Sequence, residues 1–208
     1  MKYKQKYRIS SIRIKDYDYS DNGSYFVTIC TENRKSFFGK IANDKMHYYP
    51  SGKIASEIWH DIPKYFSDIE LANWVVMPNH VHGILTIDKF YRAKRDAINR
   101  VSTGKNNVLC RDAIYRVSAY RVSAYRVSTG GITGDKNPML GQSLSRIIRW
   151  YKGRTTFEIR KQQPHFSWQT RFYEHVIRNE KEYQEIAYYI DNNPLNWKKD
   201  NYFKSTIE

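Results

Sequence analysis

Two histidines separated by one residue, His80 and His82, have the residue type and the spacing that most directly suggest chemistry. They fall in the segment 74–87, in which an apolar stretch, a Pro-Asn turn and a second apolar stretch follow one another. Because side chains alternate between the two faces of a β-strand, both imidazoles should project to one face, and Val81 and Leu85 to the other. Neutral imidazole is the commonest protein ligand for metal ions. The spacing therefore predicts a metal site, while two ordinary sheet histidines remain the alternative.

A candidate nucleophile lies on the last helix that the sequence predicts. Tyr189 and Asn193 are four residues apart, so they should face the same side of that helix. A tyrosine hydroxyl beside a metal-binding sheet can attack a phosphodiester while the cation polarises the phosphate oxygens. The chain contains 18 tyrosines, however, and most of them must be packing or surface residues. Spacing alone does not choose Tyr189 over Tyr188 or Tyr173.

The elements that must position these side chains follow from periodicity and from helix-end signals. Three helices are expected: one that Ser51 caps and that runs to Pro63, one with an apolar stripe from Leu140 to Tyr151, and one that Asn179 caps and that ends at Asn193-Pro194. β-Branched and aromatic residues predict four strands, at 25–31, 70–77, 80–87 and 168–177. The order of these elements predicts an α+β sandwich in which helices pack on one central antiparallel sheet.

The charge balance indicates a polyanionic partner. The chain has 35 Lys and Arg against 21 Asp and Glu, a net charge of +14, which makes nucleic acid the leading partner. An anionic membrane surface is the alternative, but no apolar run is long enough to span a bilayer. The two cysteines, Cys30 and Cys110, form neither a disulfide framework nor a zinc motif, and the N-terminus lacks the apolar core of a signal peptide. We therefore expect a cytoplasmic protein with no membrane segment.

The segment 91–137 interrupts this pattern. Tyr-Arg-Val-Ser begins at Tyr115, Tyr120 and Tyr125, and a five-residue pitch fits neither a helix nor a strand. We interpret the segment as a low-complexity repeat insertion in a single domain that spans 1–208. Its ten Lys and Arg against three Asp, interleaved with Tyr, could contact single-stranded nucleic acid. An inert surface loop is the simpler interpretation.

Five ordered segments resemble the REP-associated tyrosine transposases, which belong to the single-tyrosine HUH superfamily of endonucleases. The segments are KDYDY (15–19), YFVTIC (25–30), VVMPNHVHG (75–83), WQTRFYEHVIR (168–178) and YIDNNP (189–194). The similarity covers about residues 10–90 and 140–197. It implies a ferredoxin-like, or RRM-like, sheet. It also implies that His80 and His82 are metal ligands and that Tyr189 is the nucleophile. Insertion-sequence relatives have Gln four residues after the nucleophile as a third ligand, where this chain has the shorter amide Asn193.

The resemblance also implies a reaction, DNA transposition by cleavage and rejoining of single-stranded DNA beside a hairpin. Tyr189 would form a 5′-phosphotyrosine and leave a free 3′-hydroxyl, with Mg²⁺ or Mn²⁺ held by His80, His82 and Asn193. Glu174 and His175 are expected to orient the ligands, although core or surface roles explain them as well.

Four basic residues of the second predicted helix are expected to line a DNA groove, although a solvated helix face explains them almost as well: Arg146, Arg149, Lys152 and Arg154. Two other functions stay open at this point. One is a hairpin-binding module that has lost cleavage, and the other is a metal hydrolase that attacks with water. The oligomeric state is expected to be a monomer or a homodimer.

Overall fold

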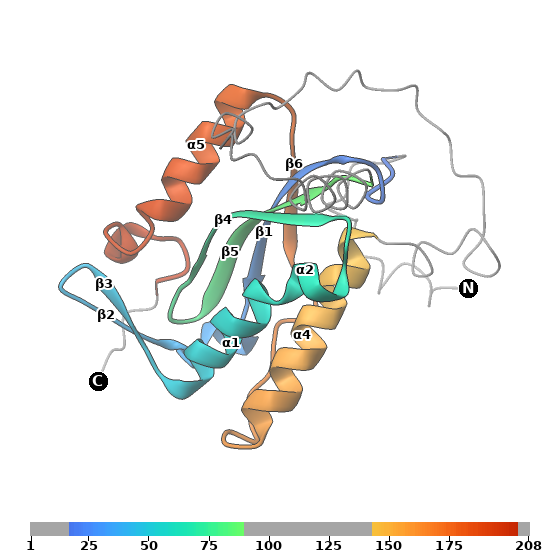
Figure 1. Cartoon of the computed structure of the whole chain (residues 1–208). Coiled ribbons are helices and arrows are strands. Elements are labelled where there is room, and N and C mark those ends of the chain that lie inside the picture. Colours follow the sequence, from blue (N-terminus) through green and yellow to red (C-terminus); the bar gives the residue numbers. More distant parts are fainter. Residues whose placement is uncertain (1–16, 90–142, 204–208) are drawn as a thin grey trace, which may run out of the picture.

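A computed structural model of the chain describes residues 17–89 and 143–203 (Figure 1). Its centre is one four-stranded antiparallel sheet with the strand order β4-β5-β1-β6. The strands are β1 (Gly23–Cys30), β4 (Ile69–Val76), β5 (His80–Ile87) and β6 (Tyr173–Ile177). The helices are α1 (Pro50–His60), α2 (Ile62–Tyr65), α4 (Leu144–Arg160) and α5 (Glu180–Asp191). The α+β sandwich with a central antiparallel sheet is thereby confirmed.

The alternation of side chains along β1 and β5 divides the sheet into two faces. Val27 on β1 and Val81 on β5 project toward α1 and α4 and belong to the main hydrophobic core. His80, His82 and Ile84 project to the other face, where Ile84 packs against α5. In Figure 1, α1 and α4 lie together on one side of the sheet and α5 lies on the other. The two histidines therefore share the face that α5 covers, as the spacing predicts.

A glycine fixes how closely α1 approaches the histidine strand. Gly83 follows His82 directly, and its position projects to the core face. A Cβ atom built there would lie 2.3 Å from Cζ2 of Trp59 on α1. The indole consequently packs directly against the backbone of β5, which only the absence of a side chain permits.

The first predicted helix differs from the expectation in two ways. The helix begins at Pro50 with Tyr49 as the N-cap residue, so the prediction that Ser51 caps it is wrong. Ser51 is instead buried, and its hydroxyl donates a hydrogen bond to the carbonyl oxygen of Phe37. The helix is also divided, because α1 ends at His60 and α2 starts at Ile62, with Pro63 in its first turn. Proline is tolerated in a first turn, where its missing N–H would have no helical partner.

A short hairpin escapes the sequence analysis. Strands β2 (Gly39–Ala42) and β3 (Lys45–Tyr48) form a separate two-stranded sheet. Asn43 and Asp44 connect them with φ angles of 49° and 58°, the left-handed conformation that a type I′ turn requires. Asn-Asp is a usable signal for such a turn, but the short flanking strands have little alternation and are half-exposed.

The remaining described elements agree with the expectations except at the start of one strand. Asn179 caps α5, since its Oδ1 accepts a hydrogen bond from the backbone N–H of Glu182 at 2.9 Å. The strand expected at 168–177 begins only at Tyr173, and Trp168 makes a single bridge to Thr31. The start of the second helix at Leu140 and the insertion 91–137 lie outside the described residues.

Two 3₁₀ turns, η1 (Glu32–Arg34) and η3 (Trp197–Lys199), flank the histidine end of the sheet. No helix among the described residues combines the length and the apolar character needed to cross a membrane.

Candidate active site

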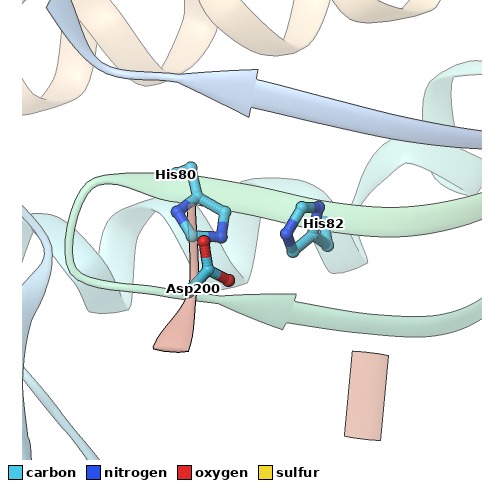
Figure 2. A group of neighbouring side chains, drawn as sticks. All are labelled: His80, His82 and Asp200. Carbon is cyan, nitrogen blue, oxygen red and sulfur yellow. The ribbon is translucent and has the colours of Figure 1, made fainter. Parts of the chain in front are cut away.

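The two histidines are buried side by side on β5. His80 and His82 have exposures of 0% and 1%, and their ring centroids are 4.4 Å apart. Figure 2 shows both rings projecting from the same strand, with the carboxylate of Asp200 beside them. One ligand atom of each of these three residues lies within 4.8 Å of the others. Ligand atoms that share one cation at about 2.1 Å lie about 3 to 4 Å apart, so the group needs only a small contraction to hold an ion.

The orientation of the His80 ring follows from its neighbour. Asn79 donates hydrogen bonds from Nδ2 to the carbonyl oxygens of Arg34, at 3.1 Å, and Tyr202, at 2.8 Å. Its Oδ1 must therefore be the atom that faces Nδ1 of His80, at 2.8 Å, and it can only accept. The proton of the neutral imidazole is consequently on Nδ1. Nε2 of His80 keeps its lone pair, and this buried atom has no hydrogen-bond partner among the described residues.

His82 is held in a similar way from the neighbouring strand. Its Nδ1 lies 2.8 Å from Oγ1 of Thr28 on β1, and its Nε2 lies 3.1 Å from the hydroxyl of Tyr189 on α5. With its proton on Nδ1, His82 donates to Thr28 and leaves Nε2 to accept a hydrogen bond from Tyr189. An imidazole whose Nδ1–H is fixed and whose Nε2 lone pair is available is the usual form of a metal-ligating histidine.

The position of α5 brings Tyr189 to this pair. Ala187 and Ile190 are buried against the sheet, whereas Tyr189 at the edge of that stripe is 42% exposed. Its ring lies 5.2 Å from the ring of His82. The other two tyrosines that the spacing allowed lie differently. Tyr188 points away with 72% exposure. Tyr173 projects from β6 to the same face as His82, but its ring packs edge-on against Phe26 at 6.2 Å.

Asn193 and Asp200 supply oxygen atoms to the same place. Asn193 is buried in the turn that follows α5 and donates from Nδ2 to Oδ2 of Asp200 at 3.1 Å. Its Oδ1 is a second buried acceptor with no hydrogen-bond partner among the described residues. The hydroxyl of Tyr189 lies 3.5 Å from the same Oδ2 of Asp200. The structure thus brings together the four residues named first from the sequence, His80, His82, Tyr189 and Asn193.

Asp200 was missed by the sequence analysis. It lies 120 residues after His80, and no spacing rule connects the two. Long-range contacts hold the segment around it. Nη1 of Arg34 donates to the carbonyl oxygen of Asn201 at 2.9 Å, and the Arg34 guanidinium lies 5.0 Å from the ring centre of Tyr202. The backbone N–H of Tyr202 donates to Oδ1 of Asp200 at 2.6 Å. Only the three-dimensional structure therefore shows that this carboxylate lies beside the two histidines.

Burial controls the protonation of the site. Desolvation lowers the pKa of His82 to about 3 and lowers that of His80 well below its ordinary value, with His82 and Arg34 adding to the effect at His80. Desolvation and the nearby Asp200 carboxylate raise the pKa of Tyr189 to about 12. At neutral pH the site therefore contains two neutral imidazoles and a protonated phenol. Two available imidazole nitrogens, an amide oxygen and a carboxylate form a donor set that fits a divalent cation.

Glu174 and His175 do not adjoin the candidate ligands. Glu174 is buried on β6 opposite Val27, so it projects to the face of α1 and α4, away from His82. His175 projects to the same face as His82, but its Nε2 contacts Oε1 of Glu182 at 2.6 Å. This contact ties β6 to the first turn of α5. The expected orienting roles are filled instead by Asn79 and Thr28.

The four basic residues of α4 lie on the opposite side of the sheet from Tyr189, and they divide into two sets. Nζ of Lys152 is half-buried and donates to the carbonyl oxygens of Gln169 and Thr170, so it anchors the loop that precedes β6. Arg146, Arg149 and Arg154 are exposed on the outer face of the helix. Their role in DNA binding stays a prediction.

Comparison with known proteins places the chain in a family. No family model matches it. It is 34% identical over 193 residues to an uncharacterized protein of Haemophilus influenzae (strain ATCC 51907 / DSM 11121 / KW20 / Rd), a match that covers 91% of this chain and 90% of the relative. The chain belongs to the same family as this Haemophilus protein.

One solved structure shares the fold of this chain. A REP-associated tyrosine transposase bound to a REP hairpin aligns with a TM-score of 0.51 and 21% identity, over 91% of this chain and 74% of that one. The two chains share a fold. A Deinococcus radiodurans protein aligns with a TM-score of 0.39 and 14% identity, over 86% of this chain and 97% of that one, which is too low to support a conclusion.

Proposed function

We propose that the protein is a transposase that cleaves and rejoins single-stranded DNA beside hairpins, with Tyr189 as the nucleophile. One observation carries the proposal. The Tyr189 hydroxyl lies 3.1 Å from Nε2 of His82 and 3.5 Å from the Asp200 carboxylate, next to two buried acceptor atoms that lack partners among the described residues. A tyrosine in this position is poised to form a covalent phosphodiester beside a cation site.

The proposed step is a transesterification. The Tyr189 oxygen forms a bond to phosphorus, the bond from phosphorus to the 3′-oxygen breaks, and a 5′-phosphotyrosine and a 3′-hydroxyl result. The proton that the phenol loses is balanced by the proton that the leaving 3′-oxygen gains. Because the pKa of Tyr189 is about 12, the phenol must lose its proton as it attacks. Oδ2 of Asp200, which lies 3.5 Å from the hydroxyl, is the carboxylate oxygen that we propose accepts this proton. Rejoining reverses the same step without an external energy source.

The chain's own residues fit the Mg²⁺ or Mn²⁺ that this reaction calls for. We assign Nε2 of His80, Nε2 of His82, Oδ1 of Asn193 and the carboxylate of Asp200 as the ligands. A dication bound there would stabilise the negative charge that develops on the phosphate oxygens. Asn79 fixes the tautomer of His80, and Thr28 holds the ring of His82 in place, so both imidazoles are oriented before an ion arrives.

Two observations favour a DNA hairpin as the substrate. The solved protein with the same fold is described as a REP-associated tyrosine transposase bound to a REP hairpin. The net charge of +14 is suited to a nucleic acid partner. We place the reaction in the cytoplasm, where chromosomal DNA is accessible.

The test uses end-labelled single-stranded hairpins taken from the DNA that flanks the gene, incubated with Mn²⁺ or with EDTA and separated on a denaturing gel. We expect a slow-migrating, protease-sensitive adduct that requires the cation and disappears in Tyr189→Phe. Tyr188→Phe is the matched control, because it removes the neighbouring hydroxyl, which points away from the site.

Two other results have defined meanings. Cleavage without any protein-linked DNA, and its survival in Tyr189→Phe, would identify a metal hydrolase that attacks with water. Specific retention of hairpins without cleavage under any cation would reduce the protein to a hairpin-binding module. Either result would reject the proposed covalent mechanism.

A further inference from the structure

The outer face of α4 carries a shallow groove that lies outside the candidate active site. The groove has a volume of about 600 Å³ and is lined by Arg146, Arg149, Trp150, Gly153, Arg154 and Phe157. These positions recur at intervals of three and four residues, so they form one stripe along the helix. The buried face of α4, from Leu144 to Ile159, packs into the core beneath the sheet. The groove therefore faces away from both the sheet and Tyr189.

The groove is positively charged. Three guanidinium groups line it, and no carboxylate is among the described residues that do so. The adjacent Glu158 is shared between two cations, with contacts of 3.0 Å to Arg154 and 2.6 Å to Lys161. Cations consequently outnumber carboxylates on this face, and a chain of phosphates is the complementary ligand.

The groove also presents an aromatic ring to solvent. Phe157 is 60% exposed, and the guanidinium of Arg154 and Nζ of Lys161 lie 5.8 Å and 4.8 Å from its ring centre. A Cβ atom added at Gly153, one turn earlier, would meet nothing within 4 Å, so the floor of the groove is open there. An exposed ring flanked by cations can stack on an unpaired base while the cations bind the adjoining phosphates.

We propose that this groove is a second nucleic-acid contact surface and that it binds a single strand. The arginines bind successive phosphates, and Phe157 stacks on a base. From Arg146 to Phe157 the helix rises by about 17 Å, which is enough for several nucleotides. A single strand is favoured over a duplex because a phenylalanine adds nothing to phosphate binding but can stack on a base that is free of its partner. The inference rests on the proposed function in one respect only, which is that the bound strand is DNA. The groove would bind a part of that strand that lies far from the phosphate at which Tyr189 reacts.

The test measures binding of a fluorescent oligo-dT by anisotropy in EDTA over a range of salt concentrations. The triple variant R146Q/R149Q/R154Q should bind more weakly, and the magnitude of its slope of log affinity against log salt should be smaller by about 2. The control K40Q/K45Q/K53Q removes the same charge from exposed positions on β2, β3 and α1, and it should keep the wild-type slope. Phe157→Ala should weaken binding about tenfold, and Phe157→Tyr should restore it. Circular dichroism verifies that each variant is folded.

Three results would overturn the inference. The first is that the control triple variant loses as much affinity as the arginine triple variant. The second is that Phe157→Ala keeps the wild-type affinity. The third is that the arginine triple variant and Phe157→Ala lose as much affinity for a blunt duplex of the same length as they do for oligo-dT. The outcome is separate from that of the adduct assay. If the wild-type protein formed no adduct with any hairpin while its oligo-dT binding still depended on the groove residues, the proposed function alone would be rejected.

Discussion

Burial of His80 and His82 makes the stability of the cation-free protein depend on pH. Both folded-state pKa values lie below the ordinary histidine value, that of His82 at about 3. Between these values and about pH 6.5, the unfolded chain binds more protons than the folded chain. The free energy of unfolding is therefore fully present above about pH 6.5 and falls as the pH is lowered. The loss approaches about 1.4 kcal/mol per pH unit for each histidine.

The perturbation is a shift from about pH 7 to about pH 5.5 in EDTA, followed by urea denaturation. Over this interval the two histidines together should lower the free energy of unfolding by about 2.5 kcal/mol. The variant His80→Gln/His82→Gln removes both titrating groups, so it should lose about this much of the pH dependence, whatever its absolute stability. His165→Gln removes an exposed histidine and should behave as the wild type does. If the double variant kept the wild-type pH dependence, the two imidazoles would not be buried and neutral in the cation-free protein, and the tautomer argument would fail.

Three further predictions concern single side chains. Thr28→Val should lower Mn²⁺ affinity about 10- to 100-fold in calorimetric titration without unfolding the protein, because Nδ1 of His82 loses its hydrogen-bond partner. An unchanged affinity would show that Thr28 does not support the site. Asp200→Asn should weaken Mn²⁺ at least about tenfold by loss of the carboxylate charge, while Asp21→Asn at an exposed position should not. Gly83→Ala should lower the free energy of unfolding by about 1 to 3 kcal/mol, since its Cβ would overlap an indole. Gly153→Ala, with open space around its Cβ, should be neutral or slightly stabilising; equal losses from both glycine variants would contradict the packing argument.

The sheet and the shared face of His80 and His82 were predictable because their signals are local. A period of two along 80–87 determines which side chains share a face, and burial of the odd-numbered residues of this strand against α1 and α4 enforces it. The cap at Asn179 was readable for the same reason, since the capping bond reaches only to Glu182. The start of the first helix could not be predicted in this way, because the Ser51 hydroxyl bonds to the carbonyl oxygen of Phe37, in a loop 14 residues earlier.

The rest of the site depended on contacts between segments that are distant in the chain. Nothing in the spacing of residues indicates that Asp200 meets His80, because that contact is made by a turn that Arg34 and Asn79 hold from the other half of the fold. The roles expected of Glu174 and His175 show the converse error. Both residues lie in one of the segments that carry the family resemblance, but they alternate across β6, so one faces the core and the other reaches α5.

The charges of the candidate ligands bear on what the site can bind in addition to an ion. His80, His82 and Asn193 are neutral ligands, and Asp200 contributes one negative charge. A dication held by this set retains one net positive charge, which a phosphodiester with its single negative charge neutralises. A second carboxylate in place of the amide would bind the ion more tightly but would leave no net charge to attract the phosphate. The amide of Asn193 in place of an acidic residue is therefore consistent with the proposed site, which would hold a cation and a nucleic-acid backbone together. The protonated Tyr189 adds no negative charge that would repel the phosphate.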